Sequence, residues 1–97
     1  MSAAYLIVEM RINDHEQYKA YMAAAASAVK AAGGEYLARG SRHESLEGDW
    51  QPHRVVVLRF PSYEAAKSFY DGDVYGDIRK LRAGTTEYFN MVLVDGM

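Results

Sequence analysis

Cysteine is absent from the 97-residue sequence, and only two prolines occur in it. Without cysteine the chain can form no disulfide, thiolate nucleophile or cysteine-ligated metal site, and a reducing cytoplasm is its expected location. Basic character is also lacking, because the net charge is −2 and no segment is rich in lysine or arginine. We therefore expect no nucleic-acid partner, since such binding needs cations that neutralise phosphates.

Long apolar runs and common catalytic motifs are missing as well. The first residues, MSAAYLIVEMRIND, have neither the basic stretch nor the cleavage site of a signal peptide, and their apolar run is too short to span a bilayer. No nucleotide-binding glycine motif, serine-hydrolase motif or zinc-protease motif occurs. The histidines His15, His43 and His53 lack the spacing of a metal site. The expectation is a protein with no membrane partner, no metal and no cofactor.

The apolar pattern predicts six elements in the order β-α-β-β-α-β within a single domain spanning residues 1–97. This order builds a ferredoxin-like α+β sandwich, in which two helices cover one face of a four-stranded antiparallel sheet. The predicted elements are a strand over 4–12, a helix that follows its cap at Asp14 and runs to 32, strands over 35–46 and 53–60, a helix over 63–82 and a strand over 86–94.

Residues that are typical of helix caps and turns set these predicted bounds. Asp14 caps the first helix, and Gly33 ends it by adopting the left-handed conformation. A kink or a bulge in the second strand is predicted near Gly40, where the missing side chain weakens regular pairing, and the face of Arg39 depends on whether the strand keeps register there. An Asp-Gly pair at 71–72 interrupts the second helix, which Asp73 then caps anew.

Both faces of the predicted sheet carry apolar side chains. Side chains alternate along a strand, and one set in each of three strands is purely apolar, so we assign that set to the face beneath the helices. It comprises Leu6, Val8, Met10, Val56, Leu58, Phe60, Phe89, Met91 and Leu93.

The other set, which we call the outer face, is mostly apolar too and has no helices to cover it. A bare apolar face of this extent exceeds what monomers usually expose. At roughly 25 cal/mol per Å², burying about 600 Å² of it would contribute on the order of 15 kcal/mol before association costs. A homodimer packed sheet against sheet is therefore predicted, the alternative being strands that are buried within one chain.

Particular residues make the chain similar to a known family, DUF1330. The most specific part is the pattern GG-x-Y-L-x-R-G starting at Gly33, followed by L-E-G-D-W starting at Leu46. The resemblance covers the whole chain and implies the dimeric α/β barrel, a ferredoxin-like subunit whose sheet packs on that of its twin. It implies no settled activity. Ser41 departs from the pattern, where relatives often have a second glycine. Further matching residues are Pro52, Arg54, Phe60, Pro61, Ser62, Ala65, Ala66, Phe69, Tyr70, Tyr75 and Arg82.

Four polar residues are predicted to lie among the aliphatic side chains of the outer face: Glu9, Arg39, Arg59 and Asn90. Either arginine could bind the carboxylate or enolate of a small ligand. Glu9 could act as a general base if burial raises its pKa. The alternative is a structural salt bridge between Glu9 and an arginine, because a buried charge needs a partner.

The remaining candidates surround the sheet. His53, a candidate for proton transfer, and Arg54 begin the third strand, where they either line the mouth of a cleft or meet solvent. Trp50 is interpreted as an interface anchor, with a plug over an apolar pocket as the alternative. Three residues flank the interrupted helix and are predicted to form a pocket wall between helix and sheet: Tyr70, Tyr75 and Arg82. Two tyrosines of the first helix, Tyr18 and Tyr21, are assigned to core packing.

The sequence thus favours a homodimer with a pocket for a small organic acid or carbonyl compound. Enzymes of the superfamily that the chain resembles use such pockets for cofactor-independent chemistry. If the protein is catalytic, Glu9 or His53 would transfer a proton while an arginine stabilises negative charge. The alternative is a non-catalytic ligand-binding or structural dimer module, and the sequence does not decide between the two.

Overall fold

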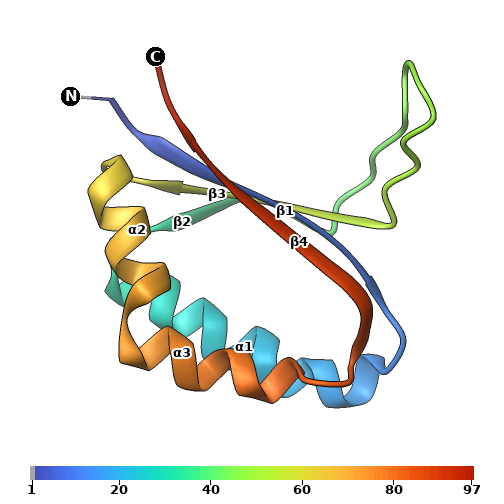
Figure 1. Cartoon of the computed structure of the whole chain (residues 1–97), viewed down its shortest axis with the longest axis horizontal. Coiled ribbons are helices and arrows are strands. Elements are labelled where there is room, and N and C mark those ends of the chain that lie inside the picture. Colours follow the sequence, from blue (N-terminus) through green and yellow to red (C-terminus); the bar gives the residue numbers. More distant parts are fainter. Residues whose placement is uncertain (1) are drawn as a thin grey trace.

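A four-stranded antiparallel sheet with strand order β2-β3-β1-β4 forms one layer of the protein, and the helices form the other (Figure 1). The computed structural model describes residues 2–97. This is the ferredoxin-like α+β architecture that the sequence predicts. The elements are β1 (Ala4–Ile12), α1 (His15–Ala31), β2 (Glu35–Arg39), β3 (Arg54–Phe60), α2 (Tyr63–Asp71), α3 (Asp73–Arg79), the 3-10 helix η1 (Lys80–Arg82) and β4 (Thr86–Asp95).

The core lies between the helices and the apolar set of sheet residues assigned to them. Leu6 of β1 pairs with Leu58 of β3 on one side and with Leu93 of β4 on the other, so the three side chains share a face. Phe60 is fully buried there. The helix-covered face predicted from the alternation is therefore confirmed.

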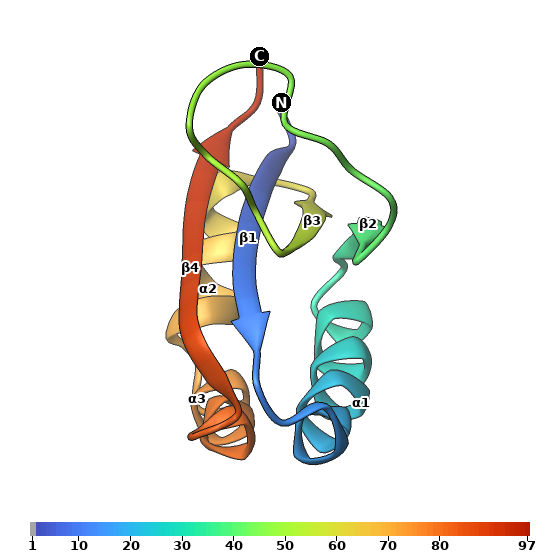
Figure 2. The ribbon, with the colours of Figure 1, turned by 90° about the vertical axis from the view of Figure 1, so that its right-hand side faces the viewer.

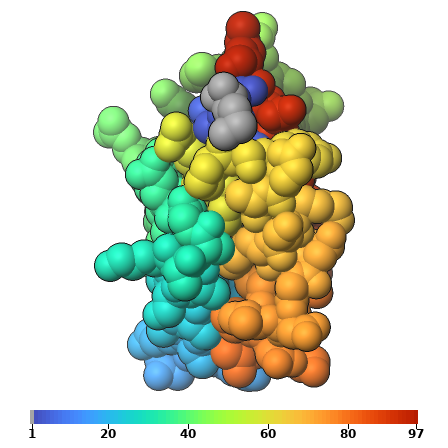
Figure 3. All heavy atoms as spheres, turned by 90° about the vertical axis from the view of Figure 1, so that its left-hand side faces the viewer, coloured from blue at the N-terminus to red at the C-terminus, as the bar shows by residue number. Residues whose placement is uncertain are grey.

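Helix α1 lies beside α3 and η1 over this face, as the space-filling view shows (Figure 3). The Asp14 side chain accepts a hydrogen bond from the backbone N–H of Gln17 at 3.0 Å, which confirms the predicted cap. Gly33 follows the helix with φ 84°, a conformation that costs glycine little. An alanine-rich middle favours the helix, because alanine has the highest helix propensity.

The second crossover is interrupted as predicted, but its cap differs from the prediction. Gly72, in an extended conformation with φ −71° and ψ 159°, separates α2 from α3. Asp73 is the first residue of α3 and makes no side-chain cap hydrogen bond, so its predicted role as the cap is wrong. It still lies in the first turn, where a negative charge favours the helix dipole.

The second strand is shorter than predicted, because β2 ends at Arg39 rather than at residue 46. Gly40 follows with φ 70°, which turns the chain away from the sheet. Residues 41–51 are all exposed, and their sequence lacks the alternation of apolar and polar side chains that is typical of a strand. They form a long loop that arches across the outer face (Figures 1 and 2). A strand prediction over this polar segment was therefore wrong.

Candidate functional site

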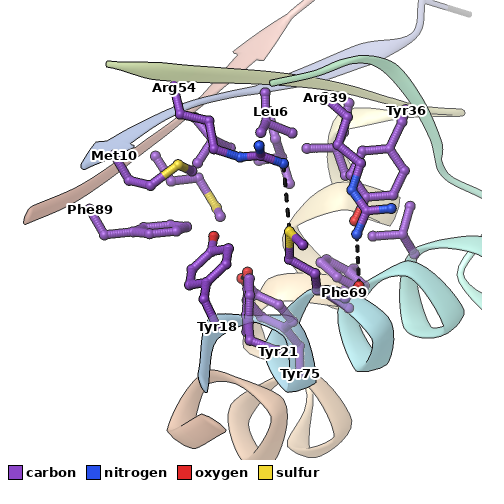
Figure 4. A pocket seen from close by; sticks show the side chains of 17 residues that line it. Leu6, Met10, Tyr18, Tyr21, Tyr36, Arg39, Arg54, Phe69, Tyr75 and Phe89 are labelled. Carbon is purple, nitrogen blue, oxygen red and sulfur yellow. Dashed lines mark hydrogen bonds between the residues drawn. The ribbon is translucent and has the colours of Figure 1, made fainter. Parts of the chain in front are cut away.

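A cavity lies between the helix-covered face of the sheet and the helices (Figure 4). Its volume is about 40 Å³, which is room for about three water molecules. Its walls are mainly aromatic and aliphatic, and no aspartate or glutamate lines it. The lining residues are Leu6, Val8, Met10, Tyr18, Tyr21, Met22, Ala25, Val29, Tyr36, Arg39, Arg54, Val56, Leu58, Phe69, Tyr75, Phe89 and Met91.

Arg39 reaches this cavity because of an irregularity in β2. Tyr36 pairs with Leu58 but Ala38 pairs with Val57, so an extra residue interrupts the register between them. A bulge of this kind reverses which face the following side chains point to. The prediction that Arg39 lies on the outer face is therefore wrong. Its guanidinium lies over the Tyr36 ring, 4.5 Å from the centroid.

Arg54 is the second cation of the cavity and has the weaker set of partners. Its Nη2 donates to the sulfur of Met22 at 3.6 Å, whereas Nη2 of Arg39 donates to the backbone carbonyl of Met22 at 2.8 Å. The Arg54 Nε is buried and has no hydrogen-bond partner among residues 2–97. Nor does any carboxylate of that range form a salt bridge with Arg54. A thioether is a poor acceptor, so Arg54 has no strong hydrogen-bond acceptor among the side chains of residues 2–97.

Gly40 makes room for the Arg54 side chain. A Cβ atom placed on Gly40 would collide with the Arg54 guanidinium, whose Cζ would be 2.6 Å away. The glycine is thus needed both for its positive φ and for the close approach of Arg54. This links the end of β2 to the position of the cation in the cavity.

Three tyrosines from the helices supply hydroxyl groups opposite the sheet. The Tyr21 and Tyr75 hydroxyl oxygens lie 2.5 Å apart and share a hydrogen bond. Tyr18 makes no hydrogen bond to another residue of 2–97 through its hydroxyl, although the side chain is buried. Burial raises the pKa of Tyr18 to about 12 and also raises the pKa values of Tyr21 and Tyr75. All three therefore stay protonated near neutral pH and can donate.

Of the predicted pocket wall, only Tyr75 lines the cavity. Arg82 lies behind it, with its Cζ 3.7 Å from the centroid of the Phe89 ring and 5.3 Å from that of Tyr21. Tyr70 lies under the guanidinium of Arg79, at 4.3 Å. Arg79 also lies 5.3 Å from the centroid of Tyr75, so the interrupted helix holds two arginines near aromatic rings that line the cavity.

Sequence reasoning missed several residues of this site. Tyr18 and Tyr21 were expected only to pack the core, but their hydroxyls point into the cavity (Figure 4). A signal was present, because a buried tyrosine usually has a polar partner that phenylalanine would not need. For Met22, which contacts both cavity arginines, nothing in the sequence pattern indicates the role.

Glu9 lies on the outer face, where it pairs with Val55 and Asn90 across the strands and is only 7% exposed. Tyr88 donates a hydrogen bond from its hydroxyl to Glu9, and the backbone N–H of His53 donates another at 3.3 Å. Burial alone would raise the Glu9 pKa. Hydrogen bonds from Tyr88, His53, Trp50 and Asn90 outweigh burial and lower it.

The two candidate catalytic residues are therefore separated from the cavity by the sheet. Glu9 and His53 do lie together, but on the face opposite Arg39 and Arg54. The lowered pKa of Glu9 is contrary to the raised value that a general base would need. Strand alternation places the outer face correctly, but it cannot foresee the hydrogen bonds that hold the carboxylate ionised.

Arg59 also lies on the outer face and does not pair with Glu9. Its Nη1 is 3.3 Å from Oε1 of Glu35 on the neighbouring strand β2, and both side chains are about half exposed. The alternative of a salt bridge between Glu9 and an arginine is therefore not realised. Trp50 is 59% exposed and does not line the cavity, so it does not plug it.

Metal ligation has no support among the residues that the structure describes. No group of three or more histidine, aspartate or glutamate side chains within residues 2–97 could hold a metal ion. Within the same range, no helix combines the length and apolar character that crossing a membrane requires.

The sequence as a whole matches a family model over residues 3–97, that of the domain of unknown function DUF1330. The chain belongs to the DUF1330 family. No curated protein matches it. Membership confirms the resemblance given by the glycine and tryptophan motifs and leaves the activity open.

Solved structures similar to this DUF1330 protein share its fold. A protein of unknown function from Rhodopseudomonas palustris has a TM-score of 0.79 at 18% identity, with 99% of this chain and 83% of that one covered. A dimeric ferredoxin-like protein of unknown function from Thermobifida fusca has a TM-score of 0.62 at 12% identity, with 98% and 92% covered. A proposed antibiotic biosynthesis monooxygenase from Nitrosomonas europaea has a TM-score of 0.60 at 17% identity, with 99% and 91% covered.

Proposed function

We propose that this DUF1330 protein is a homodimer, each subunit of which binds a small organic acid or carbonyl compound in the cavity between helices and sheet. The observation that carries the proposal is the Arg54 guanidinium, which lies among aromatic and aliphatic side chains without a carboxylate partner. Removing a cation from water is costly unless an anion and hydrogen bonds compensate it. A ligand carboxylate would supply both, through charge-assisted hydrogen bonds.

The cavity as it stands is small, and Met22 bounds it on the side of Arg54. Methionine has a flexible, unbranched side chain that adapts to different packing. A carboxylate would replace the Met22 sulfur as the acceptor for Arg54, and the displaced side chain would enlarge the cavity. This favours compact ligands over bulky ones.

The dimer is proposed from the outer face. Val92 and Val94 of β4 are 54% and 45% exposed there, and Leu46 and Trp50 extend from the loop that arches over the same face. A second copy of this chain would cover these side chains, and two solved structures with this fold are described as dimeric. Trp50 is then an interface anchor. The cytoplasmic location stays a prediction.

The positions of the ionisable groups favour binding without catalysis. Glu9 and His53 lie across the sheet from the cavity, and the cavity tyrosines have raised pKa values that suit hydrogen-bond donors rather than bases. Acid–base chemistry in the cavity would need another base, which a ligand or a second subunit would have to provide.

The test is a thermal-shift screen of the purified protein with small carboxylic acids and neutral carbonyl compounds, joined to native mass spectrometry of protein from its own host. We expect a dimer mass, and higher melting temperatures with carboxylates. A monomer at micromolar concentration would contradict the dimer. The absence of any shift with all acids would contradict the anion-binding cavity.

A further inference from the structure

The polar side chains that line the cavity, two arginines and four tyrosines, can all donate hydrogen bonds, and only the tyrosine hydroxyls can also accept them. Each arginine carries five N–H donors and no acceptor. Arg39 uses one of its donors on the Met22 carbonyl, and Arg54 uses one on the Met22 sulfur. No carboxylate, amide or imidazole side chain lines the cavity to accept the rest. A ligand that fits must therefore bring acceptors.

The helix side of the cavity adds further donors. In the pair formed by Tyr21 and Tyr75, one hydroxyl donates to the other, which leaves the second hydroxyl proton free. The Tyr18 hydroxyl has no protein partner in the described part of the chain. No charged side chain lines this wall, since the two lining arginines come from strands β2 and β3. The matching acceptor is thus a neutral oxygen.

The two sets of donors face each other across the cavity (Figure 4). Arg54 extends from the sheet, whereas the hydroxyls of Tyr18, Tyr21 and Tyr75 point toward it from the helices. The Arg54 Nε is buried without a partner among residues 2–97, so leaving it unpaired is costly, and the tyrosine hydroxyls on the opposite wall offer a second place for an acceptor. A ligand with acceptors at both ends satisfies both sets.

We propose that the ligand is a short oxo acid, whose carboxylate binds Arg54 and whose carbonyl oxygen accepts a hydrogen bond from Tyr18. This rests on the proposed binding of a small acid and adds the second group that the ligand must carry. The apolar lining packs against the carbon chain between the two groups. The cavity of about 40 Å³ must widen by displacement of Met22 to take even a short chain, which limits the ligand to a few carbons.

The experiment compares acids of equal carbon skeleton by isothermal titration calorimetry on the full-length protein. Pyruvate is compared with propionate, and 4-oxopentanoate with pentanoate, so that two separations of the carboxylate and the carbonyl group are covered. We expect one oxo acid to bind about tenfold more tightly than its unsubstituted partner, the factor that one additional hydrogen bond supplies. Tyr18→Phe should remove that preference and keep the affinity for the unsubstituted acid.

A matched control is Tyr63→Phe, which removes a hydroxyl from an exposed position on α2. It should keep the tenfold preference. Equal binding of the oxo and unsubstituted acids to the wild-type protein would overturn this inference while leaving the proposed acid binding intact. This comparison uses the wild-type protein alone, so it does not depend on the folding of any variant. A preference that persists in Tyr18→Phe would overturn the assignment of the tyrosine. No binding of any acid would overturn the proposed function itself.

Discussion

Arg54 and Arg59 lie on the same strand, β3, but point to opposite faces of the sheet. Arg59 forms an ion pair with Glu35 on the outer face, whereas Arg54 has a thioether as its hydrogen-bond acceptor in the cavity. The difference follows from the alternation of side chains along a strand. One arginine is compensated within the chain, and the other is available for an anion.

The junction between β2 and the loop holds Arg54 in place. Gly40→Ala would strain a residue with φ 70° and would also push against the Arg54 guanidinium. We expect a loss of about 1 kcal/mol or more in unfolding free energy and weaker binding of acids. Urea unfolding and calorimetry measure the two effects.

Gly48→Ala is the matched control for Gly40→Ala. Gly48 has φ 85°, but an added Cβ would meet no atom within 4 Å. The backbone strain is thus similar without the collision, so this variant should lose stability and keep its affinity for acids. Equal affinities for both alanine variants would contradict the role given to Gly40.

Glu9 is expected to stabilise the fold as a carboxylate. Its folded-state pKa is lowered, so the stabilisation is present above the unfolded-state pKa and is lost as pH falls through the folded-state value. Glu9→Gln should therefore reduce the unfolding free energy by about 1 kcal/mol at neutral pH, and the difference from wild type should shrink in acid. Urea unfolding at several pH values tests this. A difference that does not change with pH would contradict it.

The sequence predicts much of this fold because three strands alternate regularly. In β1, β3 and β4 the face of each side chain follows from its position, and Glu9 and Arg59 lie on the outer face as expected. In β2 the extra residue at the bulge reverses the pattern. Nothing in the run Tyr36-Leu37-Ala38-Arg39 distinguishes a regular strand from a bulged one, so Arg39 was assigned to the opposite face.

The candidate site was predicted less well than the fold, for two physical reasons. Whether Arg54 is paired depends on which carboxylates come near it in space, and sequence spacing does not report that. The pKa of Glu9 depends on donors from Tyr88, Trp50 and the His53 backbone, which only the folded loop brings together. Side-chain alternation placed Glu9 on its face of the sheet, but the hydrogen bonding of both residues arises from tertiary contacts.

His43 is expected to make the loop over 41–53 sensitive to pH. Its Nε2 lies 2.8 Å from the Pro52 carbonyl, and its Nδ1 lies 3.1 Å from the Ser41 carbonyl. Only the imidazolium can donate to both, and these hydrogen bonds raise the pKa of His43. The two hydrogen bonds therefore order the loop fully below the unfolded-state pKa of His43. This ordering is lost as pH rises through the raised folded-state pKa.

Fluorescence anisotropy of Trp50, the single tryptophan, reports the order of that loop. We expect the anisotropy to fall as pH rises above the ordinary histidine pKa of about 6.5 and the imidazolium loses its proton. His43→Gln removes the titrating group and should give an anisotropy that does not change as pH rises. The same titration in His43→Gln would contradict the role of His43.

The outer face is expected to form the dimer interface. Val92→Glu places a charge on that face, where burying it without a partner would be costly, and should convert the dimer to monomers. Val74→Glu is the control, since Val74 is 69% exposed on α3 and lies in the helix layer. Light scattering at matched concentrations distinguishes them. Dimers in both variants would contradict the proposed interface.

The most direct measurement compares the affinity of Arg54→Met and Arg59→Met for the acid that most raises the melting temperature of the wild-type protein. Both variants remove one cation from β3, so the loss of net charge is the same. We predict that Arg54→Met binds the acid at least tenfold more weakly, the loss expected for charge-assisted hydrogen bonds, and that Arg59→Met binds it like the wild type. Equal affinities for Arg54→Met and the wild type would contradict an anion site at Arg54.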